Sequence, residues 1–159
     1  MKGIVSALGI NSEGILAAGT FARYVSLYGS EGRGGTIAVF SVAGEQEDIG
    51  GRGITQLLWS PCGRYLHAME RMSNGAIVYD IRVAGKRLGL LKGRTARTNQ
   101  RLSADVVATA RGYEIWAGGT DGLVSVWSNP YENETTQEPT FKWKGHDGRS
   151  IRCKDLTDG

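Results

Sequence analysis

Short hydrophobic runs with alternating apolar and polar positions fill the chain, and turn residues separate them. This period of two matches half-buried β-strands, whereas no helical stripe extends beyond two turns. The 24 glycines among 159 residues are spread along the chain, which is typical of many tight turns. The pattern therefore predicts an all-β fold. The expected strands are residues 3–10, 14–19, 24–28, 36–42, 54–60, 65–69, 76–81, 88–91, 102–109, 114–117, 123–127, 140–143 and 150–154.

The strand pattern repeats at a nearly constant interval. Ile54, Leu102 and Ile151 begin successive units, at steps of 48 and 49 residues. A second register agrees, because the pairs 27–28, 78–79 and 126–127 are separated by steps of 51 and 48 residues. Repeats of about 40–50 residues with four strands each are typical of β-propeller blades.

Two motifs within this repeat resemble WD repeats. They are TDGLVSVW at residues 120–127 and the pair Gly145-His146. The resemblance implies structural roles for Asp121, Trp127 and His146. We therefore expect a partial WD-repeat β-propeller of about three four-stranded antiparallel blades. Its units are an incomplete blade at residues 1–50, blades at 51–92 and 93–144, and the start of another at 145–159.

Three blades are too few to close a ring, which typically needs four to eight. We therefore expect an open ring with exposed strand edges, and a chain that is a fragment or a truncated product of a longer gene. Exposed edges of this kind favour aggregation.

A narrower resemblance covers roughly residues 14–127. The runs at 53–82, at 98–106 (TNQRLSADV) and at 118–127 are similar to the telomerase Cajal body protein family and its fungal splicing-linked relatives. In that family an aromatic residue precedes the aspartate that follows the TNQR segment, whereas Ala104 precedes Asp105 here. The resemblance implies a nuclear protein that binds small non-coding RNA or its ribonucleoprotein, in telomerase or splicing-complex assembly.

The basic residues concentrate in one stretch, residues 82–101, which holds seven Lys or Arg and no acidic residue. The remainder of the chain has 12 basic against 16 acidic residues, although the whole chain carries a net charge of +3. Such a local excess favours a polyanionic partner, either RNA phosphates or an acidic protein, although charge runs are often only solvated faces. The candidate RNA- or partner-binding residues are Arg94, Arg97, Asn99, Gln100 and Arg101.

The TNQR segment has a second interpretation. Asn and Gln in loops often satisfy backbone groups, so this segment could brace the joint between two blades. Arg101 would then pair with Asp105 and make no contact with a ligand. The sequence leaves contact and bracing open.

No constellation of residues indicates catalysis, a metal site, a cofactor or a small-molecule substrate. His67 and His146 lack partners at useful spacing, and Cys62 and Cys153 form no metal-binding motif. The loop GSEGRGG at residues 29–35 lacks the ending of a P-loop. No apolar run approaches the length of a membrane span. We therefore expect a binding module with no enzymatic activity: an RNA or ribonucleoprotein binder, or alternatively a protein scaffold that docks an acidic partner.

Overall fold

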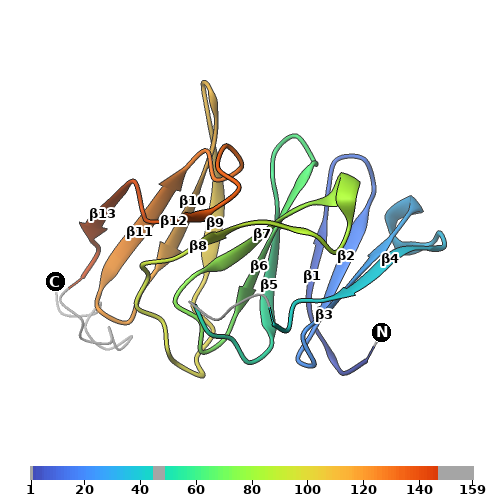
Figure 1. Cartoon of the computed structure of the whole chain (residues 1–159), viewed down its shortest axis with the longest axis horizontal. Helices are drawn as coiled ribbons and strands as arrows, with labels where there is room; N and C mark the ends of the chain where they lie inside the picture. Colours follow the sequence, from blue (N-terminus) through green and yellow to red (C-terminus); the bar gives the residue numbers. More distant parts are fainter. Residues whose placement is uncertain (1, 45–48, 147–159) are drawn as a thin grey trace, which may run out of the picture.

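The computed structural model describes residues 2–44 and 49–146. Within these residues the chain forms three β-sheets and two short 3-10 turns, which confirms the predicted all-β fold class. Figure 1 shows the sheets side by side in an open arc, as expected for part of a propeller. The strand predicted at residues 150–154 lies outside the described residues.

Each sheet is built mainly from consecutive antiparallel strands. The first sheet contains β1 (Val5–Ile10), β2 (Leu16–Thr20), β3 (Tyr24–Tyr28) and β4 (Thr36–Ser41). The second contains β5 (Ile54–Trp59), β6 (Tyr65–Glu70), β7 (Ala76–Asp80), β8 (Arg87–Leu91) and β12 (Thr136–Gln137). The third contains β9 (Ala104–Thr109), β10 (Gly112–Gly118), β11 (Leu123–Ser128) and β13 (Phe141–Lys144). The 3-10 turns are η1 (Ser30–Gly32) and η2 (Ile81–Val83).

The apolar positions of the strands form two cores, one in each joint between neighbouring sheets. Leu27, Leu57 and Tyr79 belong to the core between the first and second sheets. Ile115 and Trp127 belong to the core that also contains residues of the second and third sheets. Complete burial of a side chain of this size contributes about 1.5–3 kcal/mol, so these two joints hold the sheets together.

A repeated hydrogen bond joins the first strand of one sheet to the first strand of the next. The Ser6 hydroxyl on β1 donates to the carbonyl of Ile54 on β5, at 2.5 Å. The Gln56 amide on β5 donates to the carbonyl of Ala104 (2.7 Å) and accepts the N–H of Ala104 (3.0 Å). Both pairs are 48 residues apart, so the interval that is visible in the sequence is also the interval of the joints.

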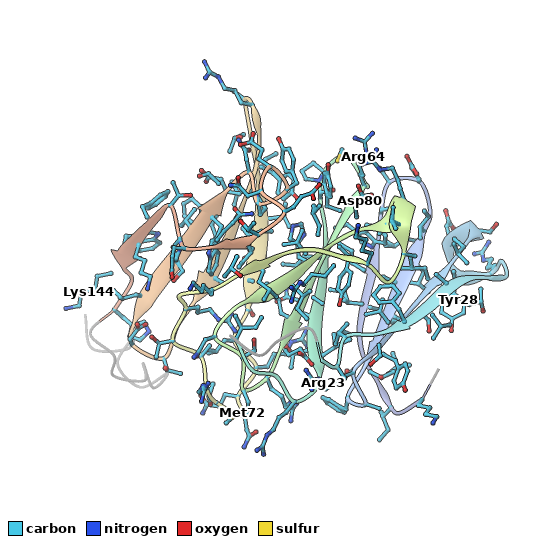
Figure 2. The ribbon with its side chains drawn as sticks, in the orientation of Figure 1. Arg23, Tyr28, Arg64, Met72, Asp80 and Lys144 are labelled. Atoms are coloured by element: carbon cyan, nitrogen blue, oxygen red, sulfur yellow. The ribbon has the colours of Figure 1, made fainter. Side chains whose placement is uncertain are left out.

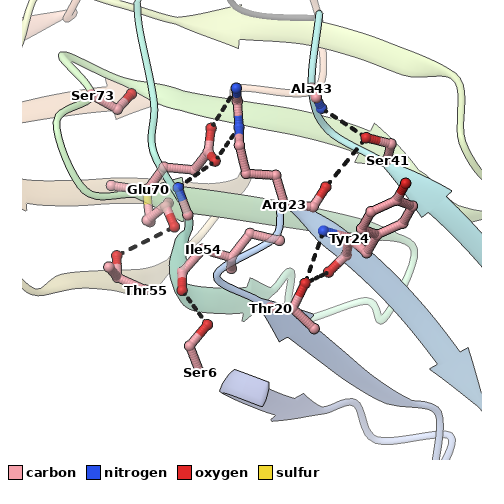
Figure 3. Close-up of polar contacts among 12 residues, drawn as sticks. Ser6, Thr20, Arg23, Tyr24, Ser41, Ala43, Ile54, Thr55, Glu70 and Ser73 are labelled. Atoms are coloured by element: carbon pink, nitrogen blue, oxygen red, sulfur yellow. Dashed lines mark hydrogen bonds and ion pairs between the residues drawn. The ribbon is translucent and has the colours of Figure 1, made fainter. Parts of the chain in front are cut away.

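An ion pair closes the joint between the first two sheets at one end (Figure 3). The Arg23 guanidinium donates to both oxygens of Glu70, at 2.9 and 3.4 Å. The Glu70 side chain is only 1% exposed and also accepts the N–H of Gly53 at 3.2 Å. This carboxylate therefore ties the β2–β3 turn, the end of β6 and the segment before β5 together.

The polar segment at residues 129–139 is mostly exposed, but it is not entirely irregular. Part of it forms β12, which pairs in parallel with β8 and adds a fifth strand to the second sheet. The N–H of Lys92 donates to the carbonyl of Gln137 at 2.9 Å, and the N–H of Leu90 donates to the carbonyl of Thr135 at 3.3 Å. A segment that follows β11 of the third sheet thus straps that sheet to the second.

Candidate interaction surface

The lower end of the molecule in Figure 1 holds the β2–β3, β6–β7 and β10–β11 turns. Figure 2 places Arg23 and Met72 at this end and Arg64 and Asp80 at the upper end. The connections before β5 and β9 also run along the lower end. We call the following six residues the loop surface: Arg52, Arg71, Arg97, Asn99, Gln100 and Arg101.

The connection at residues 92–103 is fixed because its own backbone groups form hydrogen bonds with two neighbouring turns. The N–H of Ala96 donates to the Asn74 side chain at 3.0 Å, and the carbonyl of Thr98 accepts an N–H of the β6–β7 turn at 3.0 Å. The carbonyl of Thr95 accepts both the N–H and the hydroxyl of Thr120, at 2.7 and 3.0 Å. Bracing of the joint is therefore done largely by residues 95–98, ahead of the rest of the TNQR segment.

Four of the five candidate residues, Arg97, Asn99, Gln100 and Arg101, have exposed side chains. Within the described residues none of these side chains forms a hydrogen bond or an ion pair. The expected pairing of Arg101 with Asp105 is absent there, and Arg101 instead borders a shallow hollow beside residues 5–8 of β1. The charged and amide groups of these side chains are therefore open to a ligand.

Arg94, the fifth candidate, is buried with 4% of its surface exposed. Its Nη2 donates to the Ser73 carbonyl at 3.5 Å, while its Nε and Nη1 have no acceptor within the described residues. Burial lowers the pKa of Arg94 to about 10, which still leaves the guanidinium charged at neutral pH. The structure places this residue in the joint between the second and third sheets, away from the accessible surface.

The backbone at Arg94 follows the repeat of the chain. The pair Gly93-Arg94 occupies the place in its unit that Gly145-His146 occupies in the next. In both units the N–H of the second residue donates to a backbone carbonyl of the preceding turn. Arg94 donates to the carbonyl of Asn74 at 3.1 Å, and His146 donates to the carbonyl of Gly122 at 3.3 Å. Arg94 is buried whereas His146 is exposed, so the shared position accounts for the backbone bond and not for the burial of the side chain.

Arg52 and Arg71 extend the loop surface, although neither is among the candidate residues that the sequence predicts. Arg52 is exposed and its N–H donates to the carbonyl of Arg71 at 3.0 Å. The Arg71 guanidinium lies 4.5 Å from the centre of the Phe21 ring, which is a cation–π contact. Both residues lie outside the basic stretch at residues 82–101. The β6–β7 turn places them beside the connection at residues 92–103.

The basic stretch itself does not form one patch, because β8 carries it from the upper to the lower end. Arg82 lies beyond the upper end of β7 and pairs with Asp80 at 2.5 Å. Lys86 borders a hollow at that same end, next to Asp80. Lys92 pairs with Glu138 at 3.4 Å. Of the seven basic residues of the stretch, Arg97 and Arg101 belong to the loop surface.

The residues expected at structural WD positions are placed as follows. Trp127 is buried and its ring N–H donates to the carbonyl of Lys92 at 3.1 Å. Asp121 is exposed and its side chain accepts the N–H of Leu123 at 3.1 Å, which closes the β10–β11 turn. The N–H of His146 donates to Gly122 of the same turn at 3.3 Å.

Neither a metal centre nor a membrane-spanning helix occurs in the described part of the chain. Residues 2–44 and 49–146 contain no group of three or more His, Cys, Asp or Glu side chains placed to hold a metal ion. In those same ranges, no helix has the length and apolar character that a membrane span requires.

Comparison with known proteins finds a regulatory protein among the relatives. The chain is 35% identical over 131 residues to the guanine nucleotide-binding protein negative regulator 1 of Schizosaccharomyces pombe. The match covers 81% of this chain but 31% of that protein, so the chain spans about a third of the relative's length. No protein-family model matches the chain. The relative's name describes a regulator and refers to neither telomerase nor RNA.

Proposed function

We propose that the chain belongs to a non-enzymatic scaffold whose loop surface binds an acidic segment of a protein partner. The observation that carries this proposal is the pair of exposed guanidinium groups of Arg97 and Arg101, which have no partner among residues 2–44 and 49–146 and lie on a connection that is already braced. Because the loop is held in place by backbone bonds, binding costs little ordering entropy. Arg71 and Arg52 add positive charge on the neighbouring turns.

The name of the S. pombe relative supports a protein partner, because it designates a negative regulator of a guanine nucleotide-binding protein. Guanidinium groups suit this role, since each presents a planar fork of donors that matches a carboxylate. Because the chain spans about a third of this relative, we propose a contact made by this part of the protein and take no partner or activity from the whole regulator.

A pull-down from native extract tests this proposal. We expect the intact chain to retain its partners after nuclease treatment, and the double variant Arg97→Glu/Arg101→Glu to lose them. Arg33→Glu is the matched control, because Arg33 is exposed and lies in the β3–β4 connection, next to η1. Retention of all partners by the double variant would exclude the loop surface as the docking site.

A second candidate function is binding of a small non-coding RNA or its ribonucleoprotein in the nucleus, in a telomerase or splicing context. The exposed amide groups of Asn99 and Gln100 beside the two guanidinium groups favour it, because amides can contact base edges while guanidinium groups neutralise phosphates. Single-stranded RNA binding would then weaken with salt, and the slope of log affinity against log salt would fall by about 0.7 for each lost phosphate contact.

The two candidates predict opposite results in the same experiment. Loss of all partners on nuclease treatment would support the RNA candidate and exclude the protein candidate. For the RNA candidate, a 15-nucleotide poly(U) RNA is a suitable probe (about one single-strand site), and Asn99→Ala/Gln100→Ala should change its affinity less than Arg97→Ala/Arg101→Ala. Binding that neither salt nor these substitutions alters would exclude direct RNA contact.

A further inference from the structure

A cleft with tyrosine walls lies at the upper end of the joint between the second and third sheets. Tyr65 at the start of β6, Tyr113 on β10 and Tyr131 after β11 line it, and its volume is about 230 Å³. Pro61, Cys62, Arg64 and Gly112 complete the lining. The cleft is separate from the loop surface, which lies at the opposite end of the molecule.

The three rings form one stacked wall. Tyr131 stacks on Tyr65 with centroids 5.1 Å apart and on Tyr113 with centroids 5.3 Å apart. The hydroxyl of Tyr113 is buried and bonded to Nε2 of His67 at 3.1 Å, so its polar end is already satisfied inside the joint. The cleft therefore offers mainly aromatic surface.

The Tyr131 ring is held in place by the strap, the segment at residues 129–139 that contains β12. The Gln137 side chain donates to the carbonyls of Pro130 and Asn133, at 2.9 and 3.1 Å, on either side of Tyr131. β12 in turn pairs with β8. A wall fixed in this way is preorganised, so an occupant would not have to order it.

The size and charge of the cleft limit its occupant. About 230 Å³ is below the roughly 300–1,000 Å³ of pockets for drug-sized ligands and cofactors, and it suits a single large side chain. Arg64 is the charged residue of the lining, is exposed, and forms no ion pair within the described residues. A carboxylate is its natural complement.

We propose that this tyrosine cleft binds a segment of a protein partner in which an aromatic side chain lies next to a carboxylate. The aromatic ring packs against the tyrosine wall, where ring pairs contribute about 0.5–1.5 kcal/mol beyond the area they bury. The carboxylate accepts hydrogen bonds from the Arg64 guanidinium at the rim.

Cys62 at the rim provides a reporter of occupancy. Its thiol is exposed and lies 3.3 Å from the Ser60 hydroxyl. Burial acts to raise the pKa of Cys62, but the Ser60 hydrogen bond, backbone N–H groups and the charge of Arg64 outweigh it and leave the pKa lowered. A thiol of this kind reacts readily with iodoacetamide.

The test measures the alkylation rate of Cys62 in the full chain carrying Cys153→Ser. The probe is the peptide acetyl-Glu-Trp-Glu-amide, and the controls are acetyl-Glu-Ala-Glu-amide and acetyl-Lys-Trp-Lys-amide. We expect the probe at saturation to slow alkylation about fivefold or more, as an occupied rim excludes the reagent. Neither control should do so. Absence of protection, or equal protection by either control, would overturn the proposal.

Two variants assign the effect to the cleft. Arg64→Gln and Tyr131→Leu should each abolish the protection, whereas Arg33→Gln, a matched change of an exposed arginine outside the cleft, should preserve it. Because Arg64 itself influences the Cys62 thiol, the readout is the ratio of rates with and without probe in each variant. Undiminished protection in Arg64→Gln would contradict the role of the carboxylate.

Discussion

At the scale of single residues, the charged guanidinium of Arg94 is buried in the joint, where its one hydrogen bond within the described residues is long, at 3.5 Å. Two of its nitrogens, Nε and Nη1, lack an acceptor within the described residues, and a buried unsatisfied donor costs about 1–3 kcal/mol. Replacement by an unbranched apolar side chain of similar length removes this cost. We expect Arg94→Met to raise the free energy of unfolding by about 1 kcal/mol, measured by urea denaturation.

The matched control for this substitution is Arg97→Met, which changes an exposed arginine three residues away and should alter stability by less than about 0.5 kcal/mol. A loss of stability in Arg94→Met would mean that the buried guanidinium does have an anionic partner in solution.

His67 makes the stability of the joint depend on pH. Burial lowers the pKa of this histidine from 6.5 to about 4, while its hydrogen bond to the Leu58 carbonyl acts in the opposite direction. The unfolded chain therefore binds a proton more readily than the folded chain between these values. The stability that depends on a neutral His67 should be fully present well above pH 6.5. The free energy of unfolding should fall by roughly 3 kcal/mol as the pH decreases to about 4.

Denaturation measured between pH 4 and 7 in the wild type and in His67→Gln checks this prediction. The variant loses the imidazole, so its stability should change less with pH than that of the wild type, whatever its absolute stability. Equal slopes in the two proteins would show that other groups carry the pH dependence.

At the scale of the elements, the strap that contains β12 depends on a glycine in the strand it covers. A Cβ atom at Gly89 of β8 would lie 2.9 Å from the carbonyl oxygen of Thr135 and 3.1 Å from that of Asn133. We expect Gly89→Val to displace the strap and to destabilise the protein by about 1–3 kcal/mol. Hydrogen exchange of the Leu90 and Lys92 amides should accelerate, because both donate to the strap.

Gly35→Ala is the control for the strap, because a Cβ atom at Gly35 would have no neighbour within 4 Å. Unchanged exchange at Leu90 and Lys92 in Gly89→Val would mean that the strap pairs with β8 even when a side chain intervenes.

The same elements show what the sequence could and could not predict. β3 was predicted with its observed bounds, because its alternation and flanking turns are strong local signals. β12 was missed, since a two-residue strand has no periodicity and its pairing depends on a backbone far away in the sequence. In the candidate site, the exposure of Arg97 and Arg101 follows from charge, but the burial of Arg94 and the proximity of Arg71 depend on how turns meet between sheets.

At the scale of the whole molecule, each end of the arc presents an apolar sheet face. On the first sheet, the paired residues Leu8, Ala18, Ser26 and Val39 share one face, on which Leu8 is 63% and Val39 47% exposed while Ala18 and Ser26 are buried between them. On the third sheet, Trp116 contacts both Phe141 and Trp143, and each of the last two is 44% exposed. Figure 1 shows β4 and β13 at opposite ends of the arc.

These two faces differ in composition, so contact between them would be heterologous and would join molecules head to tail. Burial of one Trp side chain removes about 150–250 Å² from water, which makes Trp143 a strong contributor. We expect the isolated chain to associate with increasing concentration in sedimentation velocity, and Trp143→Lys to shift it toward monomer. Val83→Lys should leave association unchanged, since Val83 is exposed but lies in η2, away from both faces. A monomeric wild type across the concentration series, or association that Trp143→Lys leaves intact, would show that these faces do not bind one another.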